Sequence, residues 1–191
     1  EFYIRRIRRI LPALYMVIVL SLIASYFILS PIHLNRFGES SISSTLGVSN
    51  FFFWYEDGYF DFKKLYKPLL HTWSLSVELQ LYFFWPIFIF FLYKFCKGNF
   101  KIIVLLIILF CLTFSIIYSP RASGFFYFPG FRLYEFAIGS FTYFLKEDLK
   151  FKFNDTLFFI GILMLMLASL GFNENSIFPG SNALIPCLGT S

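Results

Sequence analysis

Several apolar runs in this chain approach the roughly 20 residues that an α-helix needs to cross a lipid bilayer. The chain has 191 residues, of which 58% are hydrophobic and only 14% are charged, whereas soluble domains carry roughly 25% charged residues. This composition excludes a disordered chain and argues against a soluble single-core domain. The sequence therefore predicts an all-α fold, a polytopic transmembrane helical bundle.

Five spanning helices and one partial element are expected. The predicted spans are residues 10–29, 77–95, 102–118, 125–145 and 156–170. Between the first two, the serine-rich stretch at residues 40–55 is too polar to face lipid, so it predicts a short helix that is re-entrant or lies along the bundle. Both ends of the chain look cut, and we expect residues 1–191 to be an internal part of one transmembrane domain.

Basic residues cluster at the ends of the apolar runs, which indicates membrane topology rather than nucleic-acid binding. Four arginines precede the first run, and Pro12 is expected in the first turn of that span, where its missing N–H costs least. Because positive charge favours the inner side, residues 1–9 are predicted to lie on the cytoplasmic side of the plasma membrane, the inner membrane of a bacterium.

The arginines themselves allow two interpretations. They could anchor the helix at lipid headgroups. If the helix begins early, however, Arg5 with Arg8 and Arg6 with Arg9 form i, i+3 pairs. Each pair would then present two guanidinium groups on one face, an arrangement suited to phosphates.

The sequence HTWSLSVELQLYFFWP, which begins at residue 71, places a polar stripe on an apolar helix. Five residues fall within an arc of about 80° on one side of such a helix: His71, Ser74, Glu78, Tyr82 and Trp85. Gln80 points nearly the opposite way. A carboxylate is costly in lipid, so the stripe should face the protein interior.

Part of this segment has a purely structural alternative. His71 and Trp73 could be interfacial residues at a helix start, with Ser74 as the N-cap. Glu78 is harder to explain in this way, because an intramembrane carboxylate usually marks a functional site. His71 and Glu78 are separated by roughly 10 Å along a helix, too far for a direct hydrogen bond. They would line one cavity, with His71 as a base or Glu78 orienting a base supplied elsewhere.

Arg132 and Glu135 are a second pair of charged residues inside an apolar stretch. Their i, i+3 spacing fits an ion pair that fixes helix register, and it fits equally two residues that line the same polar cavity. Gly139, one turn later, would let another helix or a ligand approach closely. The two histidines and three scattered cysteines predict neither a metal site nor a disulfide framework.

Four segments occur in the order FYIRRIRRILPAL, PLLHTWSLSVELQLYFFWP, FRLYEFAIG and FPGSNALIPCLGT. In these segments the chain resembles membrane-bound acyltransferase family 3, the O-acetyltransferases that modify lipopolysaccharide O-antigen, peptidoglycan and other surface glycans. The family usually has a second Glu and a Phe where this chain has Leu79 and Leu81, but neither position lies on the polar stripe. The family also carries earlier spans with a functional histidine, which are absent from this sequence.

The resemblance implies transfer of an acyl group, acetyl, from acyl-CoA to a sugar hydroxyl of a cell-surface glycan. Acetyl-CoA is then a co-substrate, with membrane lipids and the glycan acceptor as partners, and no nucleic acid. The family's arginine motif matches Arg6 and Arg9 best, with Arg5 and Arg8 as alternatives. The resemblance assigns catalytic positions to His71 and Glu78. It assigns substrate- or acyl-CoA-binding positions to seven residues: Arg6, Arg9, Trp73, Ser74, Tyr82, Arg132 and Glu135.

A membrane transporter or flippase component without transferase chemistry is the rival class. A polar stripe and charges within spans fit that class equally well on physical grounds. The arginine cluster joined to HTWSLSVE favours the transferase, and the inverted halves common in transporters are not visible in the sequence.

Overall fold

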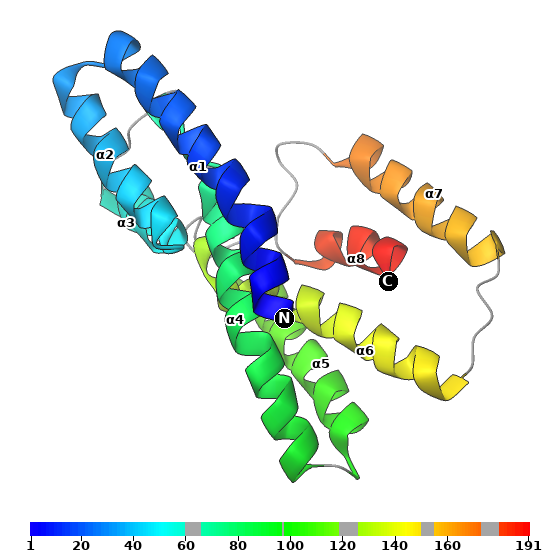
Figure 1. Ribbon diagram of the computed structural model, residues 1–191. Coiled ribbons are helices and arrows are strands. Elements are labelled where there is room, and N and C mark those ends of the chain that lie inside the picture. Colours follow the sequence, from blue (N-terminus) through cyan, green and yellow to red (C-terminus); the bar gives the residue numbers. More distant parts are fainter. Residues whose placement is uncertain (60–65, 97, 119–125, 150–154, 173–179) are drawn as a thin grey trace. The chain divides into compact units, whose positions relative to one another are not determined.

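The computed structural model describes residues 1–59, 66–96, 98–118, 126–149, 155–172 and 180–191. In these residues every regular element is helical and there is no strand, which confirms the all-α prediction. The elements, labelled in Figure 1, are α1 (Phe2–Ile28), α2 (Pro31–Thr45), α3 (Ser49–Tyr59), α4 (Thr72–Phe95), α5 (Phe100–Tyr118), the 3₁₀ helix η3 (Pro129–Arg132), α6 (Leu133–Leu149), α7 (Asp155–Gly171), the 3₁₀ helix η4 (Ser181–Ala183) and α8 (Leu184–Thr190).

Three helices of the described chain, α1, α4 and α5, are long and apolar enough to cross a membrane. They confirm the spans predicted at residues 10–29, 77–95 and 102–118. Helix α7 confirms an apolar helix at residues 156–170, although its 17 residues make it shorter than the other three. Apolar side chains along these helices are widely exposed in the structure, as a lipid-facing surface requires.

Helix α1 begins earlier than predicted. It starts at Phe2, so the arginines are helical and Pro12 lies inside the helix, not in its first turn. Arginine is a good helix former, and the first turns tolerate their unpaired N–H groups. Pro12 removes only one donor from the helix interior. The early start meets the condition under which the arginines form i, i+3 pairs.

The prediction of a continuous span at residues 125–145 is wrong. Residue 125 lies outside the described residues, and the chain then forms η3 before α6 begins at Leu133. Pro129 causes the interruption, because a proline disfavours helical geometry in the preceding residue. Phe128 is accordingly extended, with φ −85° and ψ 127°. Helix α6 continues to Leu149 and includes charged residues near its end.

The partial element predicted at residues 40–55 is two helices, α2 and α3. Gly47 separates them with φ 69°, a left-handed conformation that glycine adopts without steric cost. Its N–H bonds to the Ser44 carbonyl at 3.1 Å, and the Val48 N–H bonds to the Ser43 carbonyl at 2.9 Å. This is the hydrogen-bond pattern of a Schellman motif, which ends a helix and redirects the chain.

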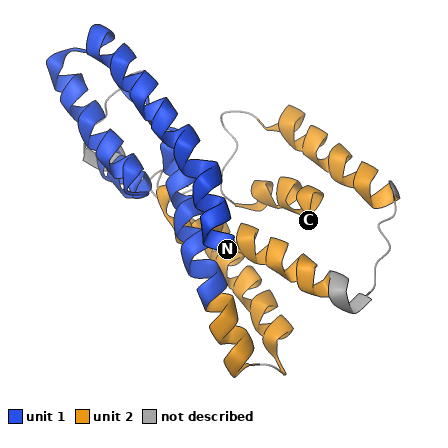
Figure 2. Ribbon diagram, viewed as in Figure 1, with its two compact units in different colours: residues 1–87 blue, residues 88–191 orange. Residues whose placement is uncertain are grey.

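The chain divides into two compact units, residues 1–87 and 88–191, with the boundary inside α4 (Figure 2). In the first unit, α1 packs on α2 and α2 packs on α3. Phe37 and Phe53 are buried in its core. In the second unit α5 packs on α6, and α7 packs on α8. Tyr134 is fully buried there, and its hydroxyl donates to the Gly180 carbonyl at 3.0 Å.

Close helix contact in the second unit depends on two glycines. A Cβ placed on Gly161 of α7 would lie 2.5 Å from the carbonyl oxygen of Gly189 in α8. Small residues allow helix backbones in membranes to approach in this way. Gly139, for which we predicted such an approach, is exposed, and an added Cβ there would meet no described atom within 4 Å.

We predict that Gly161→Ala destabilises the protein by about 1–3 kcal/mol, because the added methyl group overpacks the α7–α8 contact. Thermal unfolding of the full-length protein in detergent measures the effect. Gly171→Ala in the same helix is the control, since its Cβ would meet nothing within 4 Å. Equal melting temperatures for the two variants would contradict the packing of α7 on α8.

Candidate functional site

A cavity of about 440 Å³ lies between α1 and the first half of α4, within the first unit. It combines positive, negative and apolar groups on two otherwise apolar helices. Its lining consists of Arg6, Arg9, Ile10, Ala13, Leu14 and Val17 from α1, His71 immediately before α4, and Thr72, Leu75, Glu78 and Tyr82 from α4. Five residues that the sequence predicted as site residues are thereby brought together: Arg6, Arg9, His71, Glu78 and Tyr82.

The early start of α1 decides which arginines face the cavity. Arg6 and Arg9 line it, one helical turn apart, whereas Arg5 and Arg8 do not. Arg5 instead forms an exposed ion pair with Glu1 at 3.3 Å. Of the two arginine pairs that the sequence offers, the structure therefore presents Arg6 and Arg9 to the cavity.

Tyr82 connects the arginine side of the cavity to its carboxylate. The Arg6 guanidinium donates from Nη1 to the Tyr82 hydroxyl at 3.4 Å, and its Cζ lies 4.5 Å from the centre of the Tyr82 ring, in cation–π geometry. The Tyr82 hydroxyl in turn donates to Oε1 of Glu78 at 2.5 Å. Arg6, Tyr82 and Glu78 thus form a continuous polar chain across the two helices.

The position of this polar chain along α4 bears on the two interpretations of the arginines, an anchor or an anion site. Tyr82 is near the middle of α4, which runs from Thr72 to Phe95. Arg6, which contacts it, is therefore level with the middle of an apolar helix and not with its end. Arginines that only anchor a helix at headgroups are expected near a membrane surface. Both interpretations of the arginines, an anchor at headgroups and a site for an anion, stay predictions.

His71 marks the opposite end of the cavity. Helices α1 and α4 run antiparallel, because Tyr3 of α1 bonds to the Phe83 carbonyl of α4 while the cavity joins Val17 to His71. Eleven residues separate His71 from Tyr82, roughly 16 Å along a helix. The cavity thus has a cationic end at Arg6, the Glu78 carboxylate near it, and an imidazole at the far end beyond an apolar stretch.

Two residues of the predicted polar stripe, Ser74 and Trp85, and the predicted binding residue Trp73 do not line the cavity. Ser74 is exposed and donates to the His71 carbonyl at 3.1 Å. Trp73 and Trp85 are buried and do not line the cavity. Four of the residues that line the cavity at this helix, His71, Leu75, Glu78 and Tyr82, repeat at i, i+4, i+7 and i+11, and Thr72 lies beside them. Trp73 and Ser74 flank the site without facing it.

The opposite face of α4 carries a second polar row, which the sequence reasoning did not identify. The Thr72 hydroxyl lies 2.7 Å from that of Ser44, and the Ser76 hydroxyl lies 2.7 Å from that of Ser49. Gln80 donates to the Gly47 carbonyl at 2.8 Å and to the Asn50 side chain at 2.9 Å. The signal was available as the i, i+4 spacing of Thr72, Ser76 and Gln80, together with the serine-rich stretch that supplies the partners.

Arg132 and Glu135 belong to the second unit. Arg132 ends η3, and its guanidinium lies over the Phe126 ring with Cζ 5.1 Å from the centroid. Glu135 is in the first turn of α6. Their roles in lining the cavity or in forming an ion pair stay predictions. In the described part of the chain, no group of three or more His, Cys, Asp and Glu residues could hold a metal ion.

Comparison with known families identifies the chain's relatives. Residues 1–189 match the family described as "Acyltransferase domain". The chain therefore belongs to this family of membrane acyltransferases, which is the family that its four sequence segments resemble. At the level of the family, the predicted class of enzyme, an acyltransferase, is confirmed.

Several individual proteins are similar to the chain. The peptidoglycan O-acetyltransferase OatA of Listeria monocytogenes is 38% identical over 63% of this chain and 20% of its own length. The putative peptidoglycan O-acetyltransferase YrhL of Bacillus subtilis is 32% identical over 73% of this chain and 23% of its own. An uncharacterized protein of Haemophilus influenzae is 31% identical over the whole chain and 84% of its own length.

The chain thus spans about a fifth of the length of the two named O-acetyltransferases. No solved structure matches it.

We predict that Gln80→Leu destabilises the protein by about 1–2 kcal/mol, since the Gly47 carbonyl and the Asn50 side chain lose half-buried hydrogen bonds. Thr113→Val is the matched control, because the exposed Thr113 hydroxyl bonds only to carbonyls of its own helix. Thermal unfolding in detergent compares the two. A Gln80→Leu protein as stable as the control would show that the second polar row does not hold α4 to α2 and α3.

Proposed function

We propose that the protein carrying this chain is a membrane O-acyltransferase that moves an acetyl group from acetyl-CoA to a sugar hydroxyl of a cell-surface glycan. The observation that carries the proposal is the cavity between α1 and α4, where two guanidinium groups, a carboxylate and an imidazole line one space. Membership of the acyltransferase family supplies the class of reaction.

Arg6 and Arg9 are the proposed binding site for the phosphates of CoA. Guanidinium groups bind phosphates through paired, charge-assisted hydrogen bonds. Arg9 is exposed in the cavity and forms no ion pair with any described residue, so its charge is available to a ligand. Arg6 is held by Tyr82, which orients it toward the same space.

The apolar middle of the cavity suits the uncharged part of the donor. Ile10, Ala13, Val17 and Leu75 line the stretch between the arginines and His71. With the phosphates of CoA bound at Arg6 and Arg9, the pantetheine arm would extend along this stretch. Its thioester would then lie toward His71, away from the cationic end.

The reaction requires a base and an acceptor hydroxyl that is positioned next to the thioester carbonyl. The sugar oxygen attacks the thioester carbonyl carbon, a C–O bond forms, and the C–S bond breaks. CoA leaves as a thiolate that takes up a proton, while the hydroxyl proton passes to a base. His71 is the imidazole that this chain brings to the cavity for that proton. Glu78, fixed by Tyr82, lies roughly 10 Å from His71 along the helix, so its proposed role is to orient another polar group of the bound substrates.

The acceptor is proposed from relatives and from topology. Two relatives carry names that specify peptidoglycan O-acetylation. We propose a glycan of the cell envelope, which includes peptidoglycan, lipopolysaccharide O-antigen and exopolysaccharide. The basic N-terminal end of α1 would lie on the cytoplasmic side of the inner membrane, where acetyl-CoA is made.

We predict that Arg6→Gln and Arg9→Gln each raise the KM for acetyl-CoA by about 10- to 100-fold, the loss expected for a charge-assisted hydrogen bond. Transfer of labelled acetyl to a glycan acceptor by the purified full-length protein gives the KM. Arg8→Gln is the matched control, because Arg8 is exposed on the same helix but does not line the cavity.

An unchanged KM in both cavity variants would contradict donor binding at this end. If the protein were a transporter without transferase chemistry, even the wild-type protein would transfer no acetyl group.

A further inference from the structure

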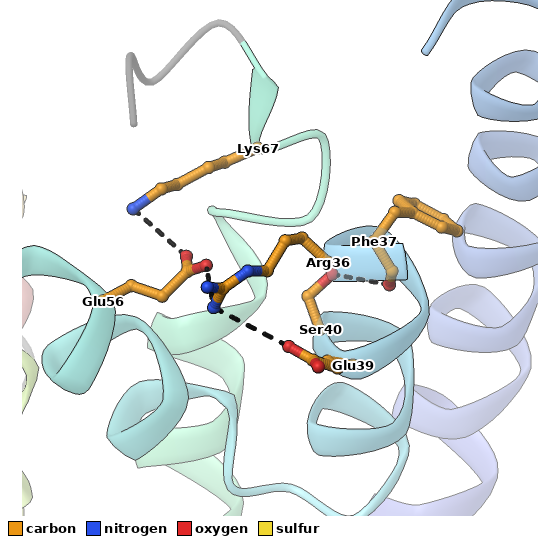
Figure 3. Close-up of polar contacts among 6 residues, drawn as sticks. All are labelled: Arg36, Phe37, Glu39, Ser40, Glu56 and Lys67. Atoms are coloured by element: carbon orange, nitrogen blue, oxygen red, sulfur yellow. Dashed lines mark hydrogen bonds and ion pairs between the residues drawn. The ribbon is translucent and has the colours of Figure 1, made fainter. Parts of the chain in front are cut away.

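A buried carboxylate outside the cavity holds three segments of the first unit together. Glu56 of α3 is 3% exposed and forms ion pairs with two cations. Oε1 lies 3.6 Å from Nη1 of Arg36 in α2, and Oε2 lies 3.2 Å from Nζ of Lys67, in the segment before α4. Figure 3 shows Arg36 extended between Glu56 and the more exposed Glu39, with Lys67 on the other side of Glu56.

Lys67 leads directly to the cavity. The Leu70 N–H bonds to the Lys67 carbonyl at 3.0 Å, and the Thr72 N–H bonds to the Leu69 carbonyl at 3.0 Å. These hydrogen bonds fold the segment from Lys67 to Thr72 into consecutive turns. His71 lies within it, four residues after Lys67.

A second attachment follows immediately after His71. The Thr72 hydroxyl contacts the hydroxyls of Ser44 at 2.7 Å and of Ser49 at 3.1 Å. His71 itself is exposed at the cavity wall. It is thus held between two attachments, one ionic and one made of hydroxyl groups, and both partners belong to α2 and α3.

We propose that Glu56 is a positioning residue: by fixing Lys67 it sets the place of His71 in the cavity, and helices α2 and α3 act as the support of the imidazole. The inference rests on the proposed role of His71 in acyl transfer. None of Arg36, Glu56 and Lys67 lines the cavity, so their effect on the reaction passes through the segment that carries His71.

The chemistry of the cluster supports this role. A carboxylate that is buried at 3% exposure needs its charge balanced, and removing it leaves two cations without their shared partner. Lys67 is only 10% exposed, so it has little water to replace the lost carboxylate. The expected response is a shift of the Lys67 segment toward solvent, while α1, with Arg6 and Arg9, keeps its place.

The test compares Glu56→Gln with Glu39→Gln in the full-length protein. Glu39 is about half exposed and contacts the same Arg36 at 3.8 Å, which makes it the matched control. We expect Glu56→Gln to lower kcat by on the order of 10- to 100-fold, the cost of a misplaced catalytic group, with the KM for acetyl-CoA unchanged. Glu39→Gln should keep both constants.

A second pair of variants keeps the test decisive if Glu56→Gln does not accumulate. Lys67→Arg retains the cation and should retain kcat, whereas Lys67→Met should lose it. A purely structural role would instead lower the amount of folded protein and leave the kcat of the folded fraction unchanged. That result, or a rise in donor KM equal to the fall in kcat, would overturn the proposal.

Hydrogen exchange separates this inference from the proposed function. In Glu56→Gln, amide exchange of residues 68–74 should increase while exchange in α1 stays at its wild-type rate. This readout needs no enzymatic activity. If the wild-type protein transferred no acetyl but exchange still rose at residues 68–74, the proposed function would fail and the positioning of His71 would stand. Unchanged exchange at these residues would overturn the positioning.

Discussion

Helix α4 carries polar groups on two faces of an apolar helix, and in a membrane each of these groups needs a partner from the protein. One face presents Glu78 and Tyr82, which are satisfied by each other and by Arg6 of α1. The other presents Thr72, Ser76 and Gln80, which bond to α2, α3 and the turn between them. The arrangement of the first unit follows from this requirement.

The two faces have different consequences. The hydroxyl and amide row is closed, because Thr72, Ser76 and Gln80 bond across short distances to α2, α3 and the turn between them. The Glu78 face remains open, because the helices part enough there to leave a cavity of about 440 Å³. In the proposed transferase the closed row would help to position the cavity, since reacting groups must be held within a fraction of an ångström.

Much of this could be read from the sequence. The apolar runs predicted α1, α4, α5 and α7, and the stripe on residues 71–85 predicted that His71, Glu78 and Tyr82 share one side. Leu79 and Leu81 lie outside the cavity, as their helical positions predicted.

Other features depend on interactions that a linear pattern does not contain. Pro129 interrupts the expected fourth span through the conformation it imposes on Phe128, and Gly47 divides the serine-rich stretch through its positive φ. Trp73 and Ser74 belong to the motif but not to the cavity wall, because Thr72 and Ser76 fix the rotation of α4. The ion pairs of Glu56 with Arg36 and Lys67 join residues far apart in the sequence, so no local spacing predicted them.

The most direct test of the account concerns Glu78. The full-length gene and its Glu78→Gln variant would be expressed in a host that lacks glycan O-acetylation, at equal membrane levels, and base-labile acetate would be measured on purified surface polysaccharides. The account predicts acetate with the wild-type protein and its loss with Glu78→Gln, which keeps the side-chain shape but removes the charge that Tyr82 and Arg6 face. Equal acetate in both strains would contradict a role for Glu78 in transfer, and acetate in neither strain would contradict the transferase itself.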